Sequence, residues 1–344
     1  MERIVSFTIT NEGFEDVEAV LRRGVGLTKN QISQAKFREN GICINGTRCR
    51  IHEKVMSGDC VCVKLEADGN NAEQLTGYAV ELDILYEDED LLLVNKPAGM
   101  AIHPSHGHYQ DTLANAVAHY YRKKMQSMQV RPVGRLDLET SGIVVFAKNQ
   151  TAAARLEQQK QDGIFRKEYV AAVQGRMERT QGEFSASIGP VPGALNKMQI
   201  CEGGKPAYTQ YQVVKLIKDK EQGEDAVRSV LRLQLKTGRT HQIRVHMASL
   251  GHPLVGDRIY GSKVEREPSR AALHAYRVWL EQPFTKEPLV VTAAIPEDMG
   301  ALDVAVQVQS SQEKDQGDFN NGKIRDAEAC QSAGDGILGI LQRD

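Results

Sequence analysis

The chain has 344 residues, of which 41% are hydrophobic and 26% are charged. This length predicts about two domains, and the composition excludes collagen-like, coiled-coil and wholly disordered chains. The formal net charge of −2 argues against a generally basic nucleic-acid binder. Residues 14–66 and 80–300 nevertheless carry a small excess of Lys and Arg, so the charge permits a phosphate-binding surface on either segment.

Signals for targeting and for disulfide bonds are lacking in the sequence. No apolar run approaches the roughly 20 residues that span a bilayer. The N-terminal lead, 1–13, has no basic patch followed by an apolar segment, so we expect a cytoplasmic protein without a membrane partner. Six cysteines without a C-x-x-C pair are typical of small buried residues in a reducing compartment rather than of a zinc site.

Residues 14–66 have the pattern of a small α/β module. Helical spacing of apolar residues predicts a helix over 16–23, and Thr28 is placed to cap a second helix that ends near residue 39. Asn45-Gly46 predicts a hairpin turn, and a last strand follows at 61–65. Four basic residues would form one face suited to RNA phosphate: Lys29, Lys36, Arg38 and Arg48. The charges alone fit a solvated surface equally well.

Composition divides the rest of the chain into three parts. Residues 67–79 are small and polar, which is typical of a linker. Residues 80–299 alternate strand-like and helix-like runs and form the candidate catalytic domain. Residues 300–344 are rich in Gln, Ser, Asp and Gly and predict a mostly disordered tail, with a short docked helix as the alternative.

The densest group of reactive side chains lies at 132–149. Asp137 stands on a loop directly before a strand-like apolar run at 143–147, and a rigid strand can hold a loop carboxylate in fixed geometry. Asp137 could therefore act as a nucleophile or a base. The more common use of such an aspartate is to cap a turn at Thr140, with Arg135 as its ion pair.

Two further segments contain candidate site residues. At 228–261, Thr240 is placed to cap a helix on which Arg244 would face a carboxylate or a phosphate. Tyr169 lies in a predicted strand, either as a core aromatic or as a buried acid/base hydroxyl. The histidines lack metal-ligand spacing, and no nucleotide- or flavin-binding motif is present, so we expect neither a metal nor another cofactor.

Five motifs follow one another along the chain: VNKPAGMAIHP at 94–104, GRLDLETSG at 134–142, KEYVAAVQG at 167–175, TGRTHQIRVHMASLGHPLVGDRIYG at 237–261 and ALHAYRV at 272–278. In this order they resemble the motifs of the RluA-type pseudouridine synthases. The segment ENGICINGTRCRIHEKVMSGDCVCV resembles the αL-type RNA-binding module first recognised in a small-subunit ribosomal protein. One departure is Gly134, where many family members have His, and it affects the expected local RNA contacts.

The resemblance implies an α+β fold with a mixed, mostly antiparallel sheet, flanking helices and a central cleft, preceded by the small RNA-binding module. It implies that the protein isomerises uridine to pseudouridine in RNA. Asp137 would be the catalytic carboxylate, Arg244 its basic partner, and Tyr169 the residue that packs against uracil. Arg135 would enter the RNA stack where the target base leaves it, and Lys96 would shape the pocket or contact RNA.

The resemblance also implies a substrate, most readily large-subunit ribosomal RNA and alternatively tRNA, and we expect a monomer. Two other classes stay open. One is an RNA-binding or ribosome-assembly protein whose catalytic site is idle. The other is a glycosidase or nucleoside hydrolase, which would need a second acidic group such as Glu139 near the first.

Overall fold

The computed structural model describes most of the chain up to residue 302. The described residues are 3–10, 13–65, 72, 74–105, 107–125, 128–218, 226–261 and 268–302. The predicted tail at 300–344 therefore lies, apart from its first three residues, outside the described residues, as does the beginning of the predicted linker. Among the described residues, no helix is both long enough and apolar enough to cross a membrane.

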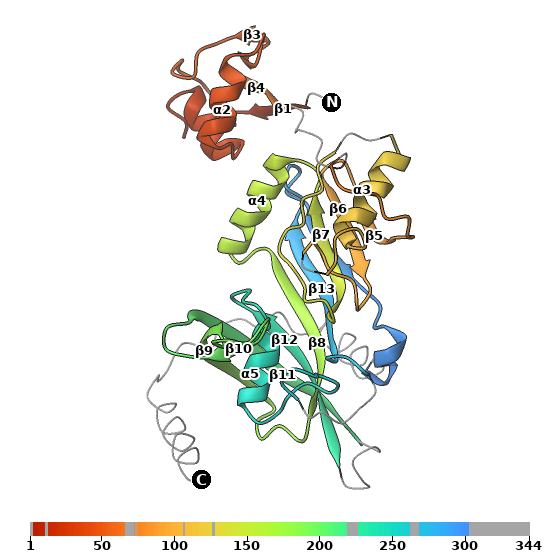
Figure 1. The fold of residues 1–344 in the computed structure, drawn as a ribbon. Helices are drawn as coiled ribbons and strands as arrows, with labels where there is room; N and C mark the ends of the chain where they lie inside the picture. Colours follow the sequence, from red (N-terminus) through yellow and green to blue (C-terminus); the bar gives the residue numbers. More distant parts are fainter. Residues whose placement is uncertain are drawn as a thin grey trace. The chain divides into compact units, whose positions relative to one another are not determined.

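A small antiparallel sheet lies near the N-terminus, with strand order β1-β4-β2-β3 (Figure 1). Its strands are β1 (Arg3–Thr8), β2 (Ile42–Ile44), β3 (Thr47–Arg48) and β4 (Cys60–Leu65). The predicted hairpin is confirmed, because β2 and β3 pair across Asn45-Gly46. β1 pairs along the whole of β4, so the sheet also includes residues from the predicted N-terminal lead.

Short helices cover this sheet. They are α1 (Val17–Ala19), the π-helical turn η1 (Val20–Gly24) and α2 (Lys29–Lys36). Thr28 caps α2 as predicted, and the side chain of Gln31 accepts a hydrogen bond from the Thr28 main chain in return. α2 ends at Lys36 rather than near residue 39, because the N–H groups of Phe37 and Arg38 both turn back to the main-chain oxygen of Ala35.

The second part is a large mixed sheet of ten strands in order β10-β9-β11-β12-β8-β13-β7-β6-β5, with β14 paired to β13 (Figure 1). Every pairing is antiparallel except that of β13 with β7. The strands are β5 (Asp83–Glu87), β6 (Leu91–Lys96), β7 (Ser141–Ala147), β8 (Arg166–Gln174), β9 (Gln181–Pro190), β10 (Met198–Ile200), β11 (Lys205–Lys218), β12 (Val227–Leu235), β13 (Leu273–Glu281) and β14 (Pro288–Thr292). The predicted fold class is confirmed.

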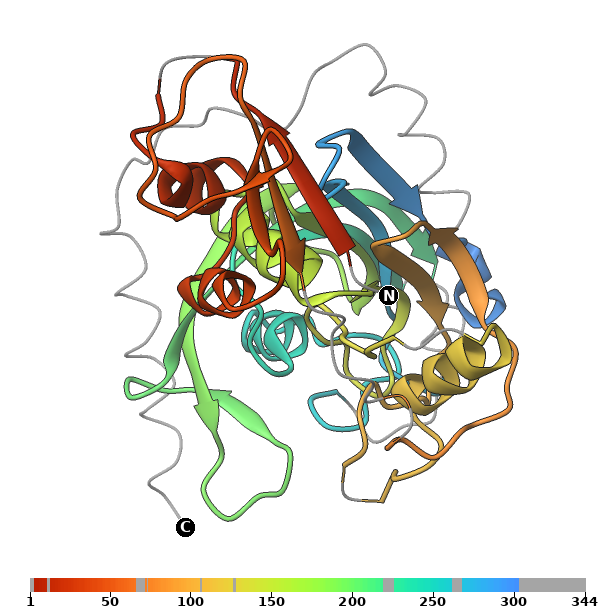
Figure 2. The same cartoon turned by 90° about the horizontal axis from the view of Figure 1, so that it is seen from above.

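Helices flank both faces of this sheet. They are α3 (Leu113–Lys123), α4 (Gln150–Gln161), α5 (Gln242–Ser249) and the 3₁₀ segment η2 (Glu297–Leu302). Leu92 and Val94 of β6 pack in one core with residues of α3 and α5, whereas Leu91 and Leu93 pack in another with α4. Figures 1 and 2 accordingly show α3 and α4 on opposite sides of β6 and β7. This alternation covers the sheet on both faces.

Strand β7 anchors the loop that precedes it. All seven of its residues are buried, as its apolar run predicted. At Gly142, where β7 pairs with β13, an added Cβ would lie 2.3 Å from the main-chain oxygen of Ala275, so only glycine allows the two backbones to approach this closely. The loop carrying Asp137 is therefore fixed at its C-terminal end.

Candidate active site

A hollow of about 400 Å³ opens beside the loop that precedes β7. The segments that carry the predicted site residues all line it: the loop around Asp137, the first half of β8 with Tyr169, and the turn into α5 together with Arg244 in α5 itself; α4 and the ends of β12 and β13 complete the lining. The sequence places these segments far apart, and the large sheet brings them together. Basic side chains also line the hollow: Arg135, Lys160, Lys167, Lys236 and Arg239. Of the two carboxylates in the lining, Glu157 is paired with Lys160 and Asp137 is not, so the hollow is a concave site with Asp137 as its candidate reactive carboxylate and a positive border.

The carboxylate of Asp137 is not used to cap the turn. The main-chain oxygen of Asp137, not its side chain, accepts the hydrogen bond from the Thr140 N–H, at 3.1 Å. The predicted ion pair with Arg135 is absent too, because this guanidinium donates to the Thr240 hydroxyl at 3.2 Å. Asp137 lines the hollow, and His241 Nε2 lies 4.0 Å from its Oδ2. This geometry favours the chemical interpretation of Asp137 over the turn-capping one.

Arg244 is held by a carboxylate that the sequence analysis did not single out. Its Nε and NH2 groups donate to the two carboxylate oxygens of Asp257 at 2.7 and 2.8 Å, and Glu139 lies 3.4 Å from NH2. Although burial opposes the charge, the hydrogen bonds and charge of Asp257 and the charges of Asp137 and Glu139 raise the pKa of Arg244. Asp137 is thus an electrostatic neighbour of Arg244, while Asp257 is its bonded partner.

Tyr169 points into the same hollow from β8. Its side chain is buried, and burial together with the negative charge of Asp137 raises its pKa well above the ordinary value. The hydroxyl therefore stays protonated at neutral pH. A neutral aromatic ring beside the carboxylate provides a flat apolar surface on which a nucleobase can rest.

Lys96 lies inside the protein beneath the Asp137 loop. Its side chain is fully buried, and Nζ donates to the main-chain oxygens of Pro97, Met100 and Leu138 at 2.8, 2.8 and 3.2 Å. Burial and the nearby charge of Arg270 lower its pKa to about 7. Of the two expected roles, this burial supports shaping the pocket and does not allow a contact with RNA.

Gly134 adopts a conformation that suits glycine and few other residues. Its φ angle is +86°, in the left-handed region, and the nearest atom to an added Cβ would be Lys160 Nζ at 3.6 Å. A histidine here would have room but would strain the backbone. Gly134 adds no side chain to the lining of the hollow, and the ammonium group of Lys160 lies close to it there.

The basic residues of the N-terminal module are separate from the hollow. Lys29, Lys36 and Arg48 are exposed and Arg38 is half-buried. The Arg48 guanidinium donates to the main-chain oxygen of Lys36 at 3.3 Å, so the hairpin and the end of α2 present their charges together. The structure thus places the predicted catalytic residues in one site and the predicted module residues in another.

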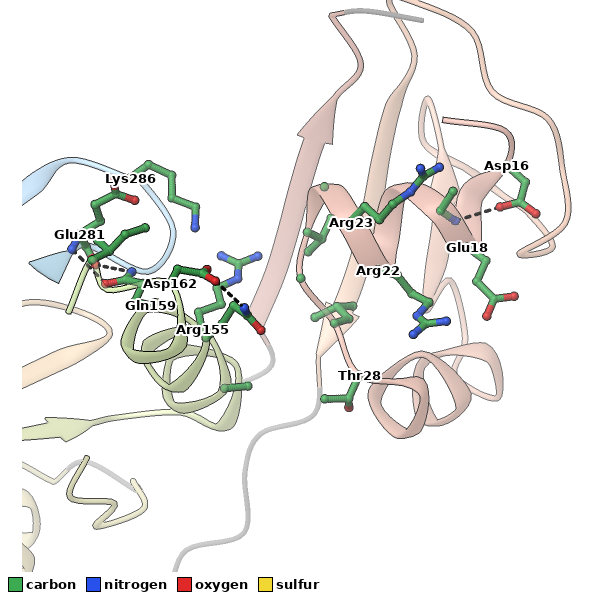
Figure 3. A pocket seen from close by; sticks show the side chains of 18 residues that line it. Asp16, Glu18, Arg22, Arg23, Thr28, Arg155, Gln159, Asp162, Glu281 and Lys286 are labelled. Carbon is green, nitrogen blue, oxygen red and sulfur yellow. Dashed lines mark hydrogen bonds between the residues drawn. The ribbon is translucent and has the colours of Figure 1, made fainter. Parts of the chain in front are cut away.

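A larger hollow, of about 850 Å³, is lined by residues of 16–28, by α4 and by Glu281 and Lys286 (Figure 3). It holds none of the predicted catalytic residues. Its arginines stand among carboxylates such as Glu18 and Asp162, so its charge is mixed (Figure 3). The smaller hollow, with its central carboxylate and positive border, is the better candidate for chemistry.

The hollow at the middle of the mixed sheet brings together a carboxylate, a flat aromatic ring and several basic side chains, as expected for an enzyme that acts on a base within an anionic nucleic-acid chain. Residues 90–249 match the family model described as RNA pseudouridylate synthase. A relative from Bacillus subtilis (strain 168), the uncharacterized RNA pseudouridine synthase YhcT, is 39% identical over 257 residues, which cover 73% of this chain and 82% of the relative.

Further similar proteins are also named as pseudouridine synthases. Ribosomal large subunit pseudouridine synthase D of Escherichia coli (strain K12) is 34% identical over 292 residues, covering 81% of this chain and 86% of that protein. The solved structure of human RNA pseudouridylate synthase domain containing 1 superposes with a TM-score of 0.55 at 28% identity, over 71% of this chain and 99% of that one. The chain belongs to the RluA family of RNA pseudouridine synthases, and it is an RNA-modifying enzyme.

Proposed function

We propose that this pseudouridine synthase modifies specific uridines of large-subunit ribosomal RNA, with Asp137 as its catalytic carboxylate. The observation that carries the assignment is the Asp137 side chain, which lines the hollow and leaves the capping of its own turn to the main chain. The choice of RNA follows the relatives, several of which are named ribosomal large subunit pseudouridine synthases.

The reaction needs the uracil to leave C1′, turn and rejoin the sugar through C5. Asp137 serves either by attacking C1′ or by removing a sugar proton, and both roles require the ionised carboxylate. The buried positive charge of Arg244 stabilises that negative charge, and Asp257 fixes the guanidinium in place. Tyr169 supports the uracil while it turns.

Binding of RNA would be divided between the two basic surfaces. At the hollow, Arg135 stands at the border and enters the stack that the target base leaves; extruding a base costs a few kcal/mol, least in an unpaired loop. Lys29, Lys36, Arg38 and Arg48 of the N-terminal module contact phosphates, which add affinity but carry little sequence information. This module acts as an RNA-binding accessory to the catalytic domain.

The test is to map pseudouridine after incubation with unmodified ribosomal RNA and tRNA, by carbodiimide block and primer extension. We expect the wild type to modify discrete positions of large-subunit RNA and Asp137→Asn to modify none. The matched control is Asp83→Asn, an exposed carboxylate on strand β5 at the sheet edge, which should keep the wild-type pattern.

Other results would change the assignment in defined ways. If only tRNA were modified, tRNA would replace large-subunit ribosomal RNA as the proposed substrate. Modification by Asp137→Asn would show that another residue is the catalytic carboxylate. Binding without modification by the wild type would favour the idle-site RNA-binding protein, and release of free uracil would favour a hydrolase. Glu139, the second acid a hydrolase would need, lies against Arg244 and the Ala271 N–H.

A further inference from the structure

His241 adopts an uncommon backbone conformation beside the proposed catalytic carboxylate. It directly precedes α5 and has a φ angle of +56°, in the left-handed region that few residues other than glycine adopt and that His, Asn and Asp adopt more often than the rest. The predicted cap, Thr240, does not begin this helix and instead accepts a hydrogen bond from Arg135. An uncommon backbone conformation next to the proposed catalytic carboxylate makes His241 a candidate for a functional role.

The imidazole of His241 joins two groups. Its Nδ1 lies 2.9 Å from the Tyr260 hydroxyl, and its Nε2 lies 4.0 Å from Asp137 Oδ2. The Tyr260 oxygen in turn accepts a hydrogen bond from the Met198 N–H at 2.8 Å, and the Tyr260 N–H donates to Asp257 at 3.1 Å. A chain of polar contacts thus runs from β10 through Tyr260 and His241 to Asp137.

The surroundings keep this imidazole neutral. Burial lowers the pKa of His241, and the charged groups that face it oppose one another: Asp137 and Asp257 raise the pKa, while Arg244 and Arg135 lower it. A neutral imidazole carries one proton, on Nδ1 or on Nε2. The contacts that the two ring nitrogens make determine which of these two tautomers is present.

The contact with the Tyr260 hydroxyl favours the tautomer of His241 that carries its proton on Nε2. The hydroxyl oxygen already accepts from Met198, and its own proton is available to Nδ1. If Nδ1 accepts that proton as a hydrogen bond, the ring proton is on Nε2, directed at the Asp137 carboxylate. The reverse tautomer would direct a lone pair at a negative charge.

We propose that Tyr260 and His241 are a positioning pair: Tyr260 fixes the tautomer of His241, and the Nε2–H of His241 orients the Asp137 carboxylate toward the sugar. This inference rests on the proposed catalytic role of Asp137 and adds two residues to it. Neither residue needs to contact RNA for this purpose. A small closing movement would bring Nε2 into hydrogen-bond range of Oδ2 when substrate fills the hollow.

The first experiment reads the tautomer directly. The full chain is labelled with ¹⁵N-histidine, the ring signals of His241 are assigned by their loss in His241→Asn, and nitrogen shifts are recorded near pH 7. We expect a neutral ring protonated on Nε2. A ring protonated on Nδ1, or a charged ring, would overturn the inference without touching the role of Asp137.

The second experiment separates positioning from a backbone role. Asn tolerates the left-handed conformation but its amide is too short to reach the place of Nε2, whereas Gln reaches it and tolerates the conformation less well. Positioning predicts that kcat falls about 10- to 100-fold in His241→Asn, since misplacement of a reacting group by about 1 Å has effects of this size, with KM within about twofold. His241→Gln should retain clearly more activity, and the opposite order would overturn the inference.

The third variant tests Tyr260. Tyr260→Phe removes the donor to Nδ1 and should lower kcat about 10-fold while KM changes little. Its matched control is Tyr86→Phe. Tyr86 lies on β5, away from the hollow, and the variant loses a hydroxyl that donates to Asp88. Equal kcat in the two variants would overturn the inference. Full activity of Asp137→Asn would overturn the proposed function and this inference with it, whereas the other contrary results overturn the inference alone.

Discussion

At the scale of single residues, the site depends on which partner each charged group has. Arg244 donates to Asp257 through Nε and one terminal nitrogen, and this bidentate pair is buried. Asp257 also accepts from the main-chain N–H groups of Ile259 and Tyr260, and these contacts together with Arg244 lower its pKa against the opposing effect of burial. A fixed arginine keeps its charge beside Asp137 without binding it directly.

The planar fork of Arg244 is therefore expected to matter more than its charge alone. In Arg244→Lys the charge remains but the two parallel bonds to Asp257 cannot form. We predict that kcat falls about 100-fold while the Kd for RNA stays within about twofold, measured by single-turnover kinetics and filter binding. If binding weakened as much as turnover, Arg244 would be a phosphate anchor. Lys123→Arg, at an exposed position on α3, is the control.

At the scale of elements, Glu87 ties three parts of the catalytic domain together at the end of β5. Its carboxylate accepts from Lys148 after β7 at 2.6 Å and from Lys124, at the C-terminal end of α3, at 2.8 Å. The Tyr120 hydroxyl of α3 donates to it as well. Although burial acts in the opposite direction, these donors lower the pKa of Glu87 to about 2.

This lowered pKa predicts a defined pH dependence of stability. Because the folded protein holds Glu87 ionised more strongly than the unfolded chain does, the contribution is complete above about pH 4.5 and is lost as the pH falls toward 2. We expect Glu87→Gln to be less stable than the wild type at pH 7, by up to about 3 kcal/mol, and the difference to shrink below pH 4. Urea denaturation of both proteins at pH 7, 4 and 3 measures this difference in the free energy of unfolding. A difference that stayed constant with pH would contradict the lowered pKa of Glu87.

At the scale of the whole molecule, groups of basic residues lie at the hollow in the large sheet and on the face of the module at α2 and β3. The first group surrounds the proposed catalytic residues, and the second includes none of them. A substrate as long as a folded RNA can contact both, and phosphate contacts add affinity in a salt-dependent manner.

Charge reversal on the module should therefore affect binding and not chemistry. In the double variant Lys36→Glu with Arg48→Glu, we predict a rise in the Kd for ribosomal RNA of about 10-fold or more at about 0.1 M salt, and a shallower salt dependence. The single-turnover rate at saturating RNA should stay within about twofold. Lys123→Glu, on α3, is the matched control. An unchanged Kd would mean that this face is a solvated surface.

The local pattern of the sequence was sufficient for several elements because the signals were themselves local. Thr28 caps α2 through a residue three positions away, Asn45-Gly46 forms its turn from adjacent residues, and the apolar run of β7 is buried whatever it packs against. The motif resemblance supplied the fold class, and it singled out Asp137, Tyr169 and Arg244, which line one hollow.

Other features depended on contacts that no local pattern contains. The pairing of β1 with β4 joins residues more than 50 positions apart, and the third main-chain oxygen that Lys96 binds comes from Leu138, in a loop far along the chain. Arg244 meets Asp257 because the segment after α5 folds back on the helix, and His241 approaches Asp137 because the turn before α5 packs beside the loop that precedes β7. The sequence by itself determined which residues are the candidates for the chemistry, because these stand in contiguous motifs. Only the tertiary structure decided which charged side chains pair with one another, because long-range packing sets the distances and the burial on which electrostatic interactions depend.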